Sequence, residues 1–68
     1  MYYIKEEKVN EIKKNFKGID IAKKVGISPT YVSLVINGLK TCPKRTAFCL
    51  AKAFNNDAEI QDYFERIS

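Results

Sequence analysis

The sequence predicts an all-α domain made of five short helices. Apolar residues recur at spacings of three and four along the chain, as on one face of a helix, and alternating runs of strand type are absent. Gly and Pro residues separate the periodic stretches. The chain has 68 residues, of which 46% are hydrophobic and 29% charged, and this is typical of one globular domain with a small core. We therefore expect a single domain over residues 1–68.

The first two helices are predicted over residues 5–16 and 19–25, with Gly18 between them. Each has apolar residues along one face. The inward-facing residues would be Val9, Ile12 and Phe16 in the first helix and Ile21, Ala22 and Val25 in the second. Gly26 should end the second helix, because glycine adopts a left-handed backbone at little steric cost.

A third helix is predicted over residues 28–37. Ser28 is a favourable N-cap, because its hydroxyl can accept a hydrogen bond from the free N–H groups of the first turn. Pro29 suits the first helical position, where its missing N–H is not needed. Gly38 should end this helix.

Two more helices are predicted over residues 43–54 and 58–67, separated by the polar stretch "NND". Pro43 begins the first of them. Their apolar stripes are Ala47, Leu50, Ala51 and Phe54 in one helix and Ile60, Tyr63, Phe64 and Ile67 in the other.

The third helix should have two chemically different faces. At about 100° per residue, one face is a buried stripe and the other is mostly polar. The buried stripe would hold Ser28, Val32, Val35, Ile36 and Leu39, and the opposite face Thr30, Ser33, Leu34 and Asn37, with Tyr31 beside it. Neither face carries a charged residue.

Charge is distributed unevenly along the chain, whose net charge is +4. Nine basic residues and one acidic residue lie between Lys13 and Asn56, which gives that stretch a net charge of +8. Four acidic residues and one basic residue follow from Asp57 onwards, for a net charge of −3. A basic middle and an acidic end favour a polyanionic ligand on one face and a different contact on the other, although a basic surface that is simply solvated fits the charges too.

Enzymatic function is not expected. The chain has no His, and it shows no nucleophile with a base, phosphate-binding glycine loop or paired carboxylates. Two Cys residues are too few for a disulfide framework or a zinc site, so we expect Cys49 to be an apolar packing residue and Cys42 an incidental thiol. We expect no cofactor and no metal. The beginning of the chain lacks the apolar region of a signal peptide, so we expect a cytoplasmic protein that does not bind membranes.

Residues 20–38, "DIAKKVGISPTYVSLVING", have the spacing of two short helices that cross at a tight turn. Ala22 allows close approach, Gly26 forms the turn, and Ile27 and Val32 fill the space between the helices. This stretch resembles the helix-turn-helix of the lambda repressor/Cro (XRE) family, and residues 39–54 resemble the fourth helix of that family. The resemblance implies a five-helix DNA-binding domain whose third helix enters the major groove, in a compact regulator of phage or mobile-element type.

One position departs from the family pattern. Gly18 stands where members of the family often have Gln, which can brace a phosphate and the recognition helix. Either the phosphate contact passes to Lys17 and to backbone N–H groups, or the grip on DNA is weaker.

The candidate DNA contacts fall into two groups. Those expected to read bases are Pro29, Thr30, Ser33, Leu34 and Asn37, and those expected to contact phosphates are Lys17, Lys23, Lys24, Ser28, Tyr31, Lys40, Lys44 and Arg45. Leu34 is a candidate for contact with a thymine methyl group, or else an isolated apolar residue on the surface. The Tyr31 hydroxyl is a candidate for a phosphate contact, or its ring packs on the turn.

We expect a sequence-specific regulator of transcription, repressor-like, that binds double-stranded DNA as a dimer on a palindromic operator. Ile60, Tyr63, Phe64 and Ile67 are the candidate dimer or partner surface, unless they close the core. The alternative is an antitoxin or antirepressor-type module that binds a protein through the helix-turn-helix domain and the acidic final helix. RNA binding is not favoured, because the sequence lacks Arg-rich segments and aromatic platforms.

Overall fold

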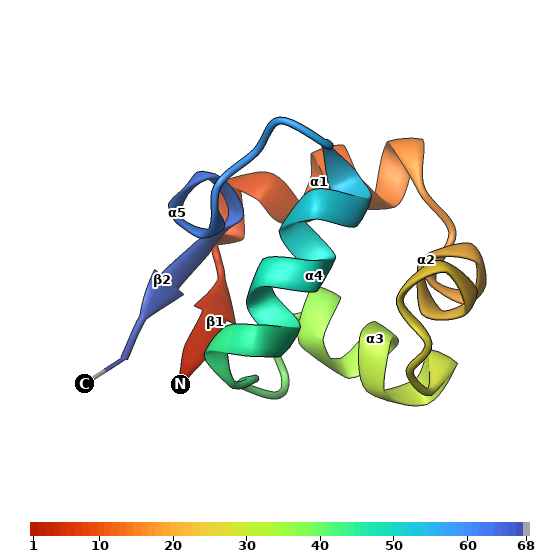
Figure 1. Ribbon diagram of the computed structural model, residues 1–68, viewed down its shortest axis with the longest axis horizontal. Helices are drawn as coiled ribbons and strands as arrows, with labels where there is room; N and C mark the ends of the chain where they lie inside the picture. The colour runs from red at the N-terminus through yellow and green to blue at the C-terminus, as the bar shows by residue number, and fades with distance from the viewer. Residues whose placement is uncertain (68) are drawn as a thin grey trace.

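Five helices and a two-stranded sheet make up residues 1–67, which are the residues that the computed structural model describes (Figure 1). In chain order the elements are β1 (Tyr2–Ile4), α1 (Glu6–Asn15), α2 (Gly18–Val25), α3 (Pro29–Ile36), α4 (Lys44–Phe54), α5 (Ile60–Tyr63) and β2 (Phe64–Arg66). The mostly helical character is confirmed. The purely all-α prediction is wrong, because the first and last segments pair as strands. Residue 68, the end of the predicted domain, lies outside the described residues.

The turn between α2 and α3 is formed at Gly26, as the sequence predicts. Its φ of 82° is left-handed, and its N–H donates to the Ala22 carbonyl at 2.8 Å. Pro29 occupies the first turn of α3, after Ser28 at the N-cap. Within residues 1–67, however, the Ser28 hydroxyl caps no N–H group of α3, so the predicted side-chain cap is wrong. The helix start depends instead on the extended backbone of Ser28 and the fixed φ of Pro29.

Helix α3 ends in a paired set of backbone hydrogen bonds around Gly38. The Leu39 N–H donates to the Leu34 carbonyl at 2.9 Å, and the Gly38 N–H donates to the Val35 carbonyl at 3.0 Å. This is the Schellman arrangement, with Gly38 left-handed at φ 75°. Because the chain leaves the helical path there, Leu39 no longer follows the helical period and is 75% exposed. Its predicted burial is therefore wrong, as is that of Ser28, which precedes the helix and is exposed.

The core draws side chains from nearly every element. The predicted inward residues of α3 and α4 are buried: Val32, Val35, Ile36, Ala47, Leu50, Ala51 and Phe54. Phe54 also joins the outer helices, because its ring lies 5.7 Å from that of Phe16 and 5.3 Å from that of Tyr63. Helix α2 packs on both α3 and α4, so the two helices of the turn share one core with the rest of the domain.

The predicted final helix over residues 58–67 is wrong for most of its length. Helix α5 has four residues and begins with a capping box between Glu59 and Asp62. The backbone turns extended at Phe64, and β2 runs antiparallel to β1 with Ile4 opposite Phe64 and Tyr2 opposite Arg66. Figure 1 shows the two strands side by side near the chain ends. Pairing with β1 and burial of Phe64, which is 1% exposed, outweigh the helical spacing of the segment.

The other edge of β1 contacts the loop before α4. The Tyr2 N–H donates to the Cys42 carbonyl at 2.7 Å, and the Cys42 N–H donates to the Tyr2 carbonyl at 2.8 Å. This bridge places the Cys42 side chain in the core, fully buried, and burial raises the pKa of its thiol. Cys49 is only partly buried. The predicted roles of the two cysteines are thus reversed, because backbone pairing with β1 decides which thiol is covered.

No helix within residues 1–67 combines the length and apolar character needed to cross a membrane.

Candidate nucleic-acid interface

The outer face of α3 is a continuous surface of small polar and apolar side chains. Val32 and Val35 are 0% exposed and hold the helix to the core. The five residues expected to read bases lie on the other side: Pro29, Thr30, Ser33 and Asn37 are exposed, and Leu34 is half-buried. The structure therefore brings this set together on one face, as the helical period predicts.

Asn37 already uses part of its hydrogen-bonding capacity within the helix. Its Nδ2 donates to the Ser33 carbonyl at 2.7 Å and to the Ser33 hydroxyl at 3.3 Å. A bidentate contact with adenine needs both the amide N–H and the amide oxygen. In this conformation, Asn37 can offer a ligand only its Oδ1.

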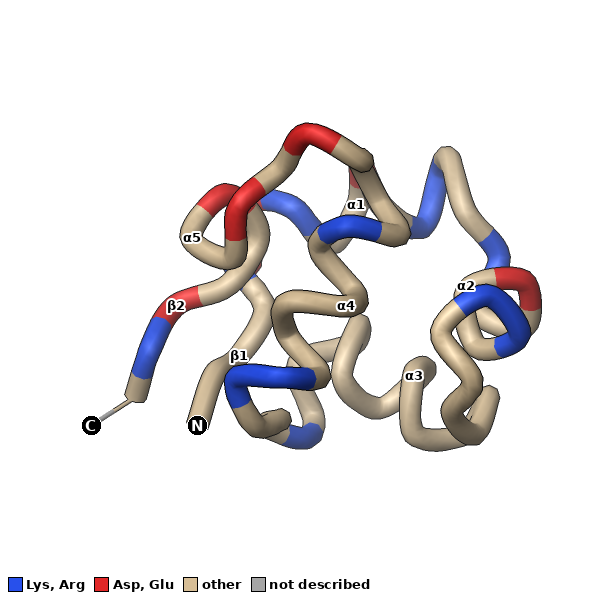
Figure 2. The backbone as a smooth tube through the Cα atoms, in the orientation of Figure 1, with Lys and Arg blue, Asp and Glu red and all other residues tan. Residues whose placement is uncertain are grey.

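Exposed basic side chains lie on both sides of α3 (Figure 2). One group comes from α2 and the residue before it, and the other comes from the α3–α4 loop and the start of α4. Their members are Lys17, Lys23 and Lys24 in the first group and Lys40, Lys44 and Arg45 in the second. We call these six residues the basic border of α3. In Figure 2 the acidic residues of α5 and of the turn before it lie at the opposite side of the molecule from α3.

The charge of the basic border is not neutralised by salt bridges. Within the described part of the chain, the only ion pair joins Lys8 and Glu11 on α1, with 3.8 Å between Nζ and Oε2. Unpaired cations around an uncharged helix can interact with a polyanion without first breaking internal pairs.

Tyr31 links α3 to the basic border. Its half-buried ring packs against the core, and the Lys40 Nζ lies 5.5 Å from the ring centroid, within the range of a cation–π contact. Burial, and then the nearby Cys42 thiol, raise the pKa of the Tyr31 phenol, while Thr46 acts in the opposite direction. The phenol therefore keeps its proton at neutral pH and can donate it. Packing of the ring and donation from the hydroxyl are compatible here.

Sequence reasoning missed two neighbours of this face. A cleft of about 100 Å³ separates the end of α1 from α3, and Lys13 lines it together with Ser33 and Asn37. Lys13 belonged to the predicted basic stretch, but only the packing of α1 reveals that it lies beside α3. The other neighbour is Leu39, whose exposure depends on the turn at Gly38.

The cleft also shows what Gly18 leaves open. A Cβ added at Gly18 would lie 4.0 Å from the Val32 Cγ1, which is an ordinary contact distance. The position therefore has room for a side chain, and packing does not require glycine there.

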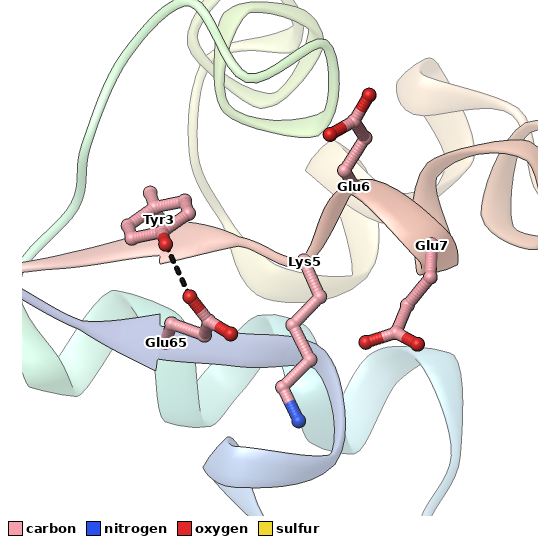
Figure 3. Close-up of a pocket in the computed structure, with 5 residues that line it drawn as sticks. All are labelled: Tyr3, Lys5, Glu6, Glu7 and Glu65. Atoms are coloured by element: carbon pink, nitrogen blue, oxygen red, sulfur yellow. Dashed lines mark hydrogen bonds between the residues drawn. The ribbon is translucent and has the colours of Figure 1, made fainter.

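A second, larger hollow of about 460 Å³ lies on the sheet side of the molecule, lined by Tyr3, Lys5, Glu6, Glu7 and Glu65 (Figure 3). The Tyr3 hydroxyl donates to the Glu65 carboxylate, and this hydrogen bond and the negative charge raise the pKa of Tyr3. No three His, Cys, Asp or Glu side chains within residues 1–67 are placed to hold a metal ion.

The predicted dimer or partner surface is largely part of the core. Phe64 is buried, and Ile60 and Tyr63 pack against the core in partly buried positions. Of the four predicted residues only Ile67 is well exposed, at 41%. Met1 and Tyr3 are also exposed, and the Ile67 N–H donates to the Met1 carbonyl at 2.8 Å. Exposed apolar side chains thus gather at the sheet instead of on a final helix.

Comparisons of the chain with protein-family models, with curated proteins and with solved structures gave no match.

Proposed function

We propose that this protein is a sequence-specific regulator of transcription that binds double-stranded DNA with α3 in the major groove. The observation that carries the proposal is the exposed, uncharged face of α3 between the two halves of the basic border. The resemblance of residues 12–54 to the lambda repressor/Cro family supports the same function.

The dimensions and the chemistry of α3 suit this role. A helix of eight residues is about 12 Å long, and the major groove is about 12 Å wide and admits an α-helix. Phosphates flank the groove on both sides, where the basic border would meet them. Contacts with phosphates fix the position of a protein on DNA, whereas contacts with base edges select the sequence. The separation of charged residues from the uncharged face matches this division.

We propose further that the protein acts as a dimer, since small helix-turn-helix modules bind paired half-sites. Met1, Tyr3 and Ile67 are the exposed apolar residues that favour the sheet as the dimer surface. A palindromic operator with half-sites one helical turn apart would follow.

A second candidate function is a protein-interaction module of antitoxin or antirepressor type. It is favoured by the acidic surface formed by Asp57, Glu59, Asp62 and Glu65, all of which are exposed. If this surface binds a partner, a protein should co-purify with the chain in stoichiometric amount from its native host, and reversing the charge of Asp57 and Asp62 should release it.

The DNA-binding proposal is tested by a mobility shift on random-sequence duplex. Engagement of the six cations of the basic border predicts an affinity loss of roughly 10³-fold between 50 and 200 mM salt. Lys44→Ala should weaken binding to all sequences alike and lower the salt slope by about one. Lys8→Ala is the control, because it removes an equal charge from a residue that pairs with Glu11 on α1. Binding that ignores salt over this range would refute the proposal.

A further inference from the structure

The side chains on the outer face of α3 leave few ways to distinguish one base pair from another by hydrogen bonds. The helix has no Lys, Arg, Gln, Asp or Glu. The N–H groups of the Asn37 amide are directed at Ser33. What remains are the hydroxyls of Thr30 and Ser33 and one amide oxygen. A hydroxyl both donates and accepts, so it can bond the edges of several bases and selects weakly among them.

Apolar groups are better represented on the same face. Thr30 and Leu34 are four residues apart, so their side chains are neighbours on the helix surface. Pro29 is exposed at the beginning of the helix, while Val32 and Val35 are fully buried and cannot reach a ligand. The accessible apolar atoms are therefore the Pro29 ring, the Thr30 methyl group and the Leu34 side chain. Leu39, 75% exposed, follows beyond the helix end.

Only one of the four bases presents an apolar group in the major groove, namely thymine with its 5-methyl group. We infer that α3 selects its DNA site mainly by apolar contact with thymine methyl groups, with Leu34 and the methyl group of Thr30 as the specificity-determining groups. This inference rests on the proposed function, because it assigns a ligand group to the face that would enter the major groove.

The decisive probe is uracil, which lacks the 5-methyl group of thymine and keeps the same pairing edge. A binding site is first selected from a random duplex pool, and each thymine of that site is then replaced singly by uracil in synthetic duplexes. Burial of one methyl group corresponds to about a fourfold change in affinity. At one or more positions in each half-site, uracil should weaken binding of the wild-type protein by about three- to fivefold.

Variants assign the effect to the side chains. Leu34→Ala should bring the affinity ratio between thymine and uracil duplexes close to one at the position that Leu34 contacts. Thr30→Ser keeps the hydroxyl and removes only a methyl group from an exposed side chain, so it tests the inference even if Leu34→Ala folds poorly. Lys44→Ala is the matched control, because it should weaken both duplexes equally and preserve the ratio. Thermal melting of each variant verifies that it is folded.

The outcomes separate this inference from the function on which it rests. Salt-dependent, sequence-selective binding that is unchanged by every uracil substitution would overturn the methyl readout and leave DNA binding intact. A thymine preference that persists in both Leu34→Ala and Thr30→Ser would overturn the assignment to these side chains. Failure to bind any duplex would overturn the proposed function and this inference together.

Discussion

The turn between α2 and α3 and the C-terminal segment from Ala58 to Ile67 have comparable apolar spacing, yet only the first adopts the structure that its sequence predicts. At the turn, Gly26 and Pro29 fix the backbone through their own covalent chemistry. The C-terminal segment has no residue of that kind inside it. Its helical spacing at Ile60, Tyr63 and Phe64 is followed only for one turn, and the backbone then pairs with β1.

The difference shows what kind of signal resists tertiary competition. A left-handed glycine or an N-terminal proline restricts φ whatever the surroundings. Apolar spacing states only which side chains seek burial, and a short segment can bury them equally well as a strand. Experiments that alter the backbone signal at the turn, or the buried contact in the C-terminal segment, test this explanation.

The largest effect is expected from Phe64→Ala. Phe64 is the largest fully buried side chain, and its removal should lower the free energy of unfolding by about 3–5 kcal/mol. A domain of this size has only a few kcal/mol of stability in total, so much of the protein should unfold. Urea denaturation followed by circular dichroism measures the change. Ile67→Ala, at the exposed end of the same segment, should change the free energy of unfolding by less than about 0.5 kcal/mol. Equal losses from the two changes would contradict tertiary control of this segment.

A smaller effect is expected from Gly26→Ala. A Cβ at this position meets no atom within 4 Å, so the penalty is conformational and should be about 1–2 kcal/mol for a left-handed residue. Gly18→Ala is the matched control, because Gly18 begins α2 with an ordinary φ and has room for a side chain. That change should stabilise the fold by about 0.4–1 kcal/mol. Thermal melting of the two variants should therefore show shifts of opposite sign, and shifts of the same sign would break the comparison.

The smallest effect is expected from alkaline pH, and it reports on the contact between β1 and the loop before α4. Burial raises the pKa of the Cys42 thiol above the ordinary value of 9.0, so the folded state favours the protonated form. Stability from this group is fully present below pH 9.0 and is lost as the pH rises through the folded pKa. The melting temperature should fall less steeply above pH 9.0 in Cys42→Ala than in the wild type.

Cys49→Ala is the matched control for that measurement, because it removes a partly exposed thiol. Tyr3 and Tyr31 also have raised pKa values, from an ordinary value of 10.0, and they contribute in the same direction at higher pH in every variant. Identical slopes in wild type and Cys42→Ala between pH 9 and 10 would show that the thiol is not held in the core as described.

Sequence reasoning on the candidate interface was strongest within α3. The helical period placed Val32 and Val35 inward and Thr30 and Ser33 outward, because side-chain direction follows directly from backbone geometry in a regular helix. It failed at Leu39, because the period stops where Gly38 turns the chain. It missed the position of Lys13 beside α3, since the packing of α1 joins residues far apart in the sequence.

The sequence by itself determined the mostly helical character, the turn at Gly26, the two faces of α3 and the uneven distribution of charge. These properties depend on residues close together in the chain, whose backbone preferences and spacing act locally. Only the tertiary structure decided that the two ends of the chain pair as strands, that Cys42 rather than Cys49 is buried, and that Phe64 closes the core. Each of these outcomes depends on partners more than 35 residues apart in the printed sequence, and a local pattern carries no information about which distant segment supplies the hydrogen bonds and the apolar cover.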